Sequence, residues 1–164
     1  MTLLSSQLKL YLTGGAGNSD PHASLGGVTS STLFVDNVLN NLFRDVTAAE
    51  AAAGSVKYRA LAFKNISGVD TAFATLFYIL LETTSAGTEI DIAYDATGTQ
   101  SIANEDTPPV GLTFSRPLSQ AAAIQLGDVP AGGERRVWFK RTVTAGAGYT
   151  TNDFGRAYFL ASTI

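Results

Sequence analysis

The stretch Ala72-Phe73-Ala74-Thr75-Leu76-Phe77-Tyr78-Ile79-Leu80-Leu81 decides the fold class of this chain. It is rich in aromatic and branched apolar residues and contains no glycine or proline, so it is predicted to be a strand. Its side chains alternate between two faces, and both sets are apolar, which is typical of a strand covered on both sides. One set contains Phe73, Phe77, Ile79 and Leu81, and the other contains Leu76, Tyr78 and Leu80.

The two apolar faces of this strand need different partners. One face fills the core of a β-sandwich. The other face requires cover from the short helix predicted below, from a loop, or from a neighbouring subunit, because apolar surface of that extent rarely stays exposed in a monomer. The sequence leaves cover from within the chain and cover by another subunit equally open.

Segments on both sides of this strand repeat the β pattern. Residues 88–95 alternate cleanly, with Ile90, Ile92 and Tyr94 predicted inward. Further strands are predicted at residues 8–12, 56–65, 135–143 and 155–162, with shorter candidates at 33–35, 112–114 and 121–126. About seven to nine short strands separated by glycine- and proline-rich turns indicate an all-β chain, a single-domain antiparallel β-sandwich of Ig-like or jelly-roll-like type.

One short helix interrupts the β pattern. Thr47-Ala48-Ala49-Glu50 matches the capping box, in which the threonine and the glutamate each bond a free backbone N–H group of the first turn. Residues 51–53 continue the helix, and Gly54 is predicted to end it. The predicted helix spans about two turns.

The segment 13–32 is polar and rich in glycine and serine, and it begins with Thr13-Gly14-Gly15-Ala16-Gly17. It is longer than most ordered loops, so we predict an extended N-terminal arm that lies on another surface, or a mobile segment. Residues 1–32 are therefore assigned to an N-terminal strand and arm, and residues 33–164 to the β-sandwich domain. An arm of this kind can wrap across a subunit boundary by ordering as it binds.

The composition offers little material for catalysis. The chain has 164 residues, no cysteine, one histidine and a charged fraction of 15%, whereas catalytic sites draw mostly on His, Cys, Asp, Glu and Lys. The net charge of −3 disfavours nucleic-acid binding, which normally requires a basic face. Without cysteine, disulfides and thiolate metal sites are excluded. We expect no enzymatic activity, no cofactor and no metal.

The sequence also carries no signal for membrane insertion or secretion. Residues 1–9 lack a basic region and a sustained apolar region, so they do not match a signal peptide. No apolar stretch approaches the roughly 18 residues of a membrane span, and the longest candidate is closed by Glu82. We expect a soluble protein made in a cytoplasm, with no membrane partner.

Two features superficially suggest chemistry in the segment 13–32. His22 follows Pro21 and is the only histidine, so no second imidazole or thiol is present to complete a catalytic or zinc site. Gly14-Gly15-Ala16-Gly17 lacks the Lys-Ser/Thr of a phosphate-binding loop. We interpret the histidine as an exposed loop residue and the glycines as a turn.

Paired carboxylates are another candidate for chemistry, because glycoside hydrolysis requires only two. Glu89 and Asp91 share the outward face of a predicted strand, and Glu105-Asp106 lies in a proline-rich loop. A solvated sheet face and turn-forming residues explain them without catalysis. Trp138 would provide an aromatic platform for a glycan, but a lone tryptophan in a strand is more often part of a core.

Arg135, Arg136, Lys140 and Arg141 form a basic cluster on one predicted strand. Arg135 and Arg141 share one face of that strand, while Arg136 and Lys140 share the other. These residues either solubilise an edge or rim strand or contact an acidic partner surface. Because the chain is acidic overall, a protein partner is favoured over nucleic acid, with rim ion pairs adding specificity.

Three groups of segments, which together cover most of the chain, resemble segments of a known protein family. The first group is Leu10-Tyr11-Leu12-Thr13-Gly14-Gly15-Ala16, Ser24-Leu25-Gly26-Gly27 and Asn40-Asn41-Leu42-Phe43-Arg44-Asp45-Val46. The second is Ala48-Ala49-Glu50-Ala51-Ala52-Ala53-Gly54, Tyr58-Arg59 and Phe63-Lys64-Asn65. The third is Pro130-Ala131-Gly132-Gly133, Val137-Trp138-Phe139-Lys140-Arg141-Thr142-Val143 and Ala145-Gly146-Ala147. The chain resembles a family of tailed-bacteriophage virion proteins, which implies a structural role in a phage particle and brings no catalytic residues.

The interpretation that we favour is a capsid decoration (cement) protein, which stabilises the assembled shell through binding free energy repeated over many sites. Its expected partners are the major capsid protein or other virion proteins, and it is expected to form a homo-oligomer, with a trimer favoured. Its expected location is the virion, assembled in the host cytoplasm. A tail, neck or baseplate component is the structural alternative, and a carbohydrate- or receptor-binding module is the alternative of another class.

The predicted contact residues come from the apolar strand and the basic strand. They are Phe73, Phe77, Tyr78, Leu80, Arg135, Arg136, Lys140 and Arg141. A structural protein predicts a buried Trp138 and self-association. A binding module predicts a monomer with an exposed aromatic cleft around Trp138 or Tyr149.

Overall fold

A computed structural model describes residues 3–150 and 153–162 of the chain. These residues form eight strands: β1 (Leu8–Thr13), β2 (Thr29–Leu33), β3 (Ser55–Asn65), β4 (Ala72–Leu81), β5 (Thr88–Asp95), β6 (Ile124–Val129), β7 (Glu134–Val143) and β8 (Arg156–Ser162). They also form the helix α1 (Ala48–Ala53) and short 3-10 turns at η1 (Ser5–Gln7), η2 (Pro21–Ala23) and η3 (Gln120–Ala122).

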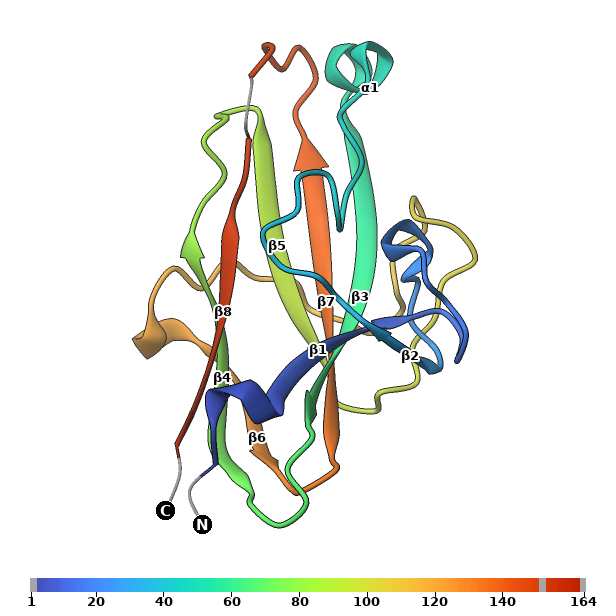
Figure 1. Cartoon of the computed structure of the whole chain (residues 1–164). Helices are drawn as coiled ribbons and strands as arrows, with labels where there is room; N and C mark the ends of the chain where they lie inside the picture. Colours follow the sequence, from blue (N-terminus) through green and yellow to red (C-terminus); the bar gives the residue numbers. More distant parts are fainter. Residues whose placement is uncertain (1–2, 151–152, 163–164) are drawn as a thin grey trace.

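The strands build two antiparallel sheets that pack face to face (Figure 1). The five-stranded sheet has the order β2-β1-β3-β7-β5, and the three-stranded sheet has the order β6-β4-β8. The all-β sandwich predicted from the alternating segments is therefore confirmed. The long predicted strands correspond to β3, β4, β5, β7 and β8, whereas residues 112–114 form no strand.

From β3 to β8, no two consecutive strands lie in the same sheet. An immunoglobulin domain differs, because it joins strands D and E, and strands F and G, within one sheet. The long pairing between β3 and β7 runs from Ser55↔Val143 to Lys64↔Glu134, and β5 pairs along the other side of β7. The middle of the larger sheet is thus built from segments that are distant in the sequence.

The core lies between the two sheets and is rich in aromatic rings. Phe77 and Phe159 stack with their ring centroids 4.4 Å apart, and Phe63 stacks on Phe159 at 4.7 Å. Phe139 meets Phe77 edge-on at 5.6 Å. Offset or edge-on pairs of this kind stabilise a core by about 0.5–1.5 kcal/mol each beyond their buried area.

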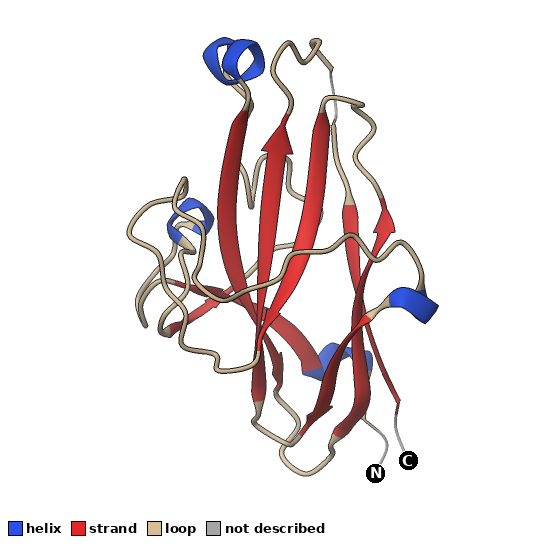
Figure 2. Ribbon diagram, turned by 180° about the vertical axis from the view of Figure 1, so that it is seen from behind, coloured by secondary structure: helices blue, strands red, loops and turns tan. Residues whose placement is uncertain are grey.

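The outer face of the five-stranded sheet carries a second, smaller core around Trp138. The indole is 0% exposed and clusters with the fully buried Ala60 and Ala93. The segment 96–123 crosses this face (Figure 2) and contributes partly buried side chains from Leu112 and Phe114. This segment therefore covers the outer face of the larger sheet, and it is called the strap below.

Residues 13–32, which the sequence led us to expect as an extended arm, fold back onto the five-stranded sheet. The Ala60 backbone N–H donates to the Ser24 carbonyl oxygen at 2.8 Å. The Arg136 guanidinium donates to the Gly27 carbonyl oxygen at 2.7 Å and to the Thr29 hydroxyl at 2.9 Å. Because β1 and β2 lie in the same sheet as β3, the predicted boundary at residue 32 does not separate two structural units.

Helix α1 has the predicted capping box. The Glu50 N–H donates to the Thr47 hydroxyl oxygen at 3.2 Å, and the Thr47 N–H donates to the Glu50 carboxylate at 2.8 Å. Gly54 ends the helix with φ of +78°. The helix leads into β3 at one end of the sandwich (Figure 1), so it does not cover the second apolar face of β4.

Candidate functional site

A β-bulge sets which side chains of β4 point outward. Ala74 has a positive φ of 46°, and the pairing register between β4 and β8 shifts between Phe73 and Leu76. Phe73 lies opposite Ser162, and Leu76 lies opposite Leu160. Because Ser162 and Leu160 share one face of β8, Phe73 joins Leu76 on the outward face, although strict alternation had placed it with Phe77.

The outward face of β4 and β8 forms an apolar surface, which we call the apolar face. Its residues are Phe73, Leu76, Tyr78, Leu80, Tyr158 and Leu160. Leu80 is 54% exposed and Tyr158 is 44% exposed. The described residues of the chain therefore leave this face partly open, in contrast to the covered face around Trp138.

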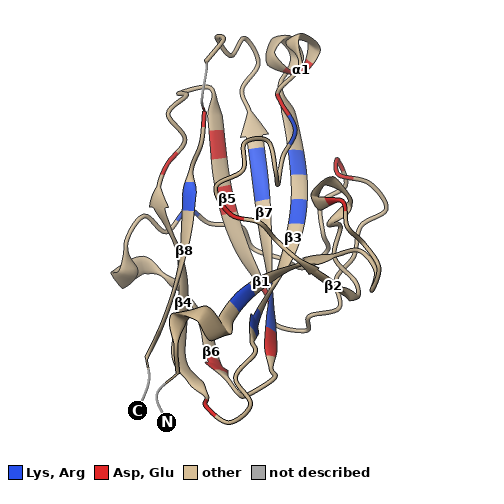
Figure 3. Ribbon diagram, in the orientation of Figure 1, with Lys and Arg blue, Asp and Glu red and all other residues tan. Residues whose placement is uncertain are grey.

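The apolar face also lies beside an open strand edge. Within the described residues, β8 pairs only with β4, so the backbone groups along its other edge have no strand partner. β4 carries no charged residue and β8 carries only Arg156. Figure 3 shows lysine and arginine concentrated on β3 and β7 instead. An open edge with a single charge is a template for pairing with another chain.

The structure places the four contact residues predicted on β4 in three different environments. Phe73 and Leu80 lie on the apolar face, as a surface contact requires. Phe77 is 0% exposed and belongs to the core, so its prediction as a contact residue is wrong. Tyr78 points outward but is 9% exposed, because it packs against Tyr158 with ring centroids 5.8 Å apart. Tyr78 is therefore a largely buried part of the apolar face that packs against the exposed Tyr158.

The basic strand is not a surface patch. Arg136 and Arg141 are buried, at 3% and 7% exposure. Lys140 pairs with the Asp91 carboxylate at 2.6 Å, and Arg135 donates to the Leu126 carbonyl oxygen at 2.9 Å. For Arg136 and Arg141 the prediction of a surface contact is wrong, because β7 has a neighbour on both sides and lies inside the sheet, not at its edge. Arg135 and Lys140 are partly exposed, and their role as contact residues stays a prediction.

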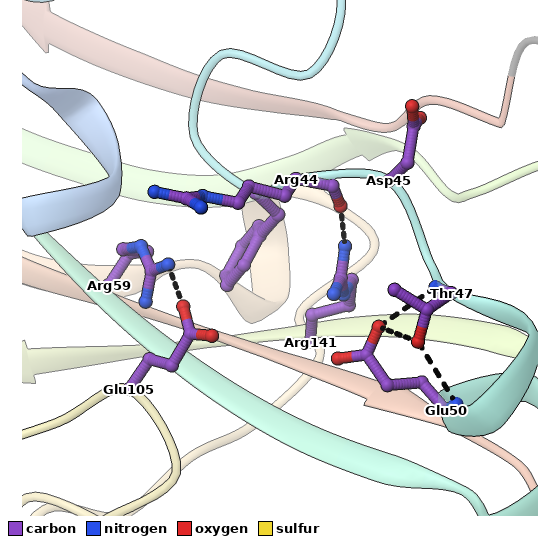
Figure 4. A pocket seen from close by; sticks show the side chains of 8 residues that line it. Arg44, Asp45, Thr47, Glu50, Arg59, Glu105 and Arg141 are labelled. Carbon is purple, nitrogen blue, oxygen red and sulfur yellow. Dashed lines mark hydrogen bonds and ion pairs between the residues drawn. The ribbon is translucent and has the colours of Figure 1, made fainter.

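A cavity of about 330 Å³ lies at the end of the sandwich near α1 (Figure 4). It is lined by Phe43, Arg44, Asp45, Thr47, Glu50, Arg59, Glu105 and Arg141. These residues come from the segment before α1, from α1 itself, from β3, from the strap and from β7. We call it the arginine cavity, because guanidinium groups from three of these segments meet there.

Two of the cations at the arginine cavity are neutralised by carboxylates. Lys57 pairs with Glu105 at 3.1 Å and Asp106 at 2.6 Å, and with Glu50 at 3.5 Å. The Arg59 guanidinium, which is 1% exposed, also pairs with Glu105. Glu105 thus bridges two cations and fastens the strap to β3.

Arg141 is not neutralised in this way. Its Nη1 donates to the Arg44 backbone carbonyl at 2.5 Å, and its guanidinium lies 5.1 Å from the centre of the Phe43 ring. Its buried Nε has no hydrogen-bond partner. Among the described residues, neither Arg141 nor the Arg44 side chain forms an ion pair.

The pKa shifts at the arginine cavity agree with this contrast between Arg59, which has a carboxylate partner, and Arg141, which has none among the described residues. Burial lowers the pKa of Arg141, and the charge of Glu50 only partly opposes that effect. The backbone hydrogen bond from Thr47 lowers the pKa of Glu50. Burial disfavours ionisation of Glu105, but hydrogen bonds from Arg59 and Lys57 hold its pKa below the ordinary value.

The remaining candidates for chemistry have structural roles. His22 Nε2 donates a hydrogen bond to the Asn40 carbonyl oxygen, 2.8 Å away, which ties two loops together. Arg116 of the strap pairs with Glu89 at 2.5 Å and with Asp91 at 3.1 Å, so these two carboxylates hold the strap. Asp95 accepts backbone hydrogen bonds in the turn that follows β5.

Two kinds of feature are absent from the described part of the chain. Residues 3–150 and 153–162 contain no group of three or more His, Cys, Asp or Glu side chains arranged to hold a metal ion. Over the same residues, no helix has the length and hydropathy needed to cross a membrane.

The arginine cavity was not predicted from the sequence. Its residues belong to five separate segments, and no local pattern connects Phe43 or Glu105 to the basic strand. The one available signal was the alternation of β3, in which Arg59 shares a face with the apolar Leu61 and Phe63. A charged residue on an inward face indicates a buried partner, and here that partner is Glu105.

No protein family model, curated protein or solved structure matches this chain.

Proposed function

We propose that this protein is a structural component of a bacteriophage virion, a capsid decoration protein that binds the assembled shell and associates with copies of itself. The observation that carries the proposal is the apolar face of β4 and β8, with Leu80 54% exposed beside the open edge of β8. The resemblance of the sequence to phage virion proteins gives the proposal its biological setting.

The apolar face suits contact with a second copy of the chain. Burying a side chain such as Leu80 stabilises an interface by about 1.5–3 kcal/mol. Strand addition at the β8 edge would supply main-chain hydrogen bonds next to that contact. Because β4 and β8 carry only one charge, Arg156, like surfaces meet without repulsion. Repetition over many shell sites then converts a modest contact into strong binding.

The burial of Trp138 supports a structural protein over a glycan-binding module. A carbohydrate-binding module needs an exposed aromatic platform, but Trp138 is 0% exposed beneath the strap. Tyr149 is 93% exposed, yet it lies in the segment after β7 and is not part of the cluster around Trp138. A tail, neck or baseplate role stays the structural alternative.

Light scattering behind size exclusion, followed by co-sedimentation with empty phage shells, tests the proposal. We expect a trimer that pellets with the shells. A double variant with Leu80→Asp and Tyr158→Asp should be monomeric, whereas Val110→Asp, which changes a 79% exposed valine of the strap, should behave like the unmodified protein. A higher-order ring that ignores shells would favour a tail or neck role, and a monomer that ignores them would refute the proposal.

A further inference from the structure

The arginine cavity contains a buried guanidinium without an ion pair. Three guanidinium groups line it, from Arg44, Arg59 and Arg141. The lining carboxylate of Glu105 pairs with Arg59, and that of Glu50 pairs with Lys57 beside the cavity. The third lining carboxylate belongs to Asp45, and Figure 4 shows it pointing away from the guanidinium groups. Because Arg44 is exposed to solvent, Arg141 is the buried guanidinium of this lining that has no ion pair with the described residues.

Arg141 has no ion-pair partner among the described residues. This guanidinium is 7% exposed, has one hydrogen bond to a backbone carbonyl and keeps a buried Nε without a partner. Removing a charged group from water without an ion pair is costly, and a counter-ion with good hydrogen-bond geometry offsets part of this cost. Arg59, in contrast, already has Glu105 as its counter-ion.

The geometry points to a bound carboxylate: we propose that the arginine cavity binds a small organic monocarboxylate, which pairs with Arg141. A planar carboxylate matches a guanidinium in two parallel hydrogen bonds. A monoanion matches the single charge of the Arg141 guanidinium, whereas a phosphate dianion brings a second negative charge next to Glu50 and Glu105. The Phe43 ring, 5.1 Å from the Arg141 guanidinium, provides an apolar contact for a short alkyl chain.

The size of the cavity agrees with such a ligand. At about 330 Å³ it lies at the lower end of the range for small-molecule sites, roughly 300–1,000 Å³. Two sources supply the same chemistry: a free short-chain acid, or the side chain of an aspartate or glutamate on a neighbouring subunit. This inference does not depend on the proposed virion function, because it rests on different residues from the apolar face.

Titration of the full chain with sodium butyrate, followed by backbone NMR, tests the proposal. We expect saturable shifts at the amides of Glu50, Arg59 and Arg141, with half-saturation in the low-millimolar range (about 1 mM corresponds to −4.1 kcal/mol). Inorganic phosphate at the same ionic strength should bind at least about tenfold more weakly. Equal or tighter binding of phosphate, or the absence of saturation, would overturn the proposal.

Three variants sharpen the result. Arg141→Met should weaken butyrate binding by at least about tenfold, and it should fold, because an apolar side chain in place of an unpaired buried charge is commonly tolerated. Arg141→Lys keeps the charge but loses the paired geometry, so we expect several-fold weaker binding. Arg135→Met removes the same group from the other end of β7 and should leave butyrate affinity unchanged. Equal affinity in all three variants would contradict the assignment of Arg141.

A competition experiment separates the two sources of the carboxylate. If saturating butyrate weakens self-association or co-sedimentation of the unmodified protein, the natural ligand is an acidic side chain of a neighbouring subunit. If butyrate binds without changing either assembly, the site takes a free acid. Both outcomes retain the carboxylate site, and only the failure of butyrate to bind refutes it.

Discussion

The two outer faces of the sandwich carry similar apolar side chains, but the chain covers one face and leaves the other partly exposed. On the five-stranded sheet, the strap covers Trp138 completely. On the three-stranded sheet, Leu80 and Tyr158 stay about half exposed. The strap is held by ion pairs from Arg116 and Glu105, whereas the apolar face has one charge, Arg156, on its two strands. Cover from within the chain thus requires polar anchors as well as apolar area.

The largest expected effect on the free energy of unfolding comes from truncating Trp138, the side chain at the centre of the covered face. Trp138→Ala should reduce the free energy of unfolding by about 3–5 kcal/mol, because it leaves a cavity beneath the strap. Urea denaturation of purified protein measures this change. Tyr149→Ala, which changes a 93% exposed ring, is the matched control and should have almost no effect. Equal effects of the two variants would show that the strap does not bury Trp138 in solution.

The second-largest effect on stability is expected where residues 13–32 approach Trp138 closely, at Gly26. A Cβ at Gly26 would collide with the Gln100 carbonyl oxygen and lie 2.6 Å from Cζ2 of Trp138, and φ there is +85°. Gly26→Ala should therefore cost about 2–5 kcal/mol from strain and overpacking together.

Gly111→Ala is the matched control for this collision. Gly111 also has a positive φ, +74°, but a Cβ added there would meet no atom within 4 Å, so only the backbone strain of about 1–2 kcal/mol applies. The difference in unfolding midpoint between the two variants isolates the contact with Trp138. Equal midpoints would mean that residues 13–32 do not pack against the sheet.

Acidification should weaken the attachment of the strap to the five-stranded sheet more than the pairing of β4 with β8. Hydrogen bonds and charge from Arg116 lower the pKa of Glu89, and Arg59 and Lys57 lower that of Glu105, both below 4.5. A carboxyl whose pKa is depressed by folding stabilises the fold above its unfolded pKa, and this stabilisation is lost as the pH falls through the folded pKa.

Hydrogen exchange corrected for the intrinsic pH effect measures this difference. Below pH 4.5, we expect faster exchange at the amides of Tyr58 and Ser115, which bond between the strap and the sheet. Amides of β4 bonded to β8 should change less, since neither strand contains a carboxylate. A uniform acceleration over both faces would show that the ion pairs do not anchor the strap.

The smallest effect on folding is expected on the apolar face. Leu80→Asp should change the free energy of unfolding of a monomer by no more than about 0.5 kcal/mol, because the side chain is already 54% exposed. Thermal unfolding at low protein concentration measures this value. A loss of several kcal/mol under these conditions would mean that Leu80 is covered within a single chain.

The sequence predicted the regular elements well and their arrangement poorly. Alternation identified β5 and β7, and the capping box located α1 to the residue, because these signals depend on neighbours in the chain. The strand order is not encoded locally, so the position of β7 inside the sheet, and hence the burial of Arg136 and Arg141, was missed.

Two further misses have specific physical causes. Residues 13–32 contain few apolar side chains, and they are held by backbone hydrogen bonds such as Ala60 to Ser24, which leave no hydrophobic pattern. The bulge at Ala74 moves Phe73 to the other face through a single residue with positive φ, and alanine gives no warning of that conformation. The arginine cavity escaped for the same reason as the strand order, since its residues meet only in the folded chain.

The alternation of strands between the two sheets has a consequence for the time course of folding. Neither β3 nor β4 pairs with a strand that is its neighbour in the sequence: β3 lies between β1 and β7, and β4 lies between β6 and β8. Chains dominated by such distant pairings fold slowly, because long loops must close before any pairing is rewarded. During synthesis, the smaller sheet stays incomplete until β8 has left the ribosome, so the apolar rings of β4 depend on a strand that is made after the other described strands.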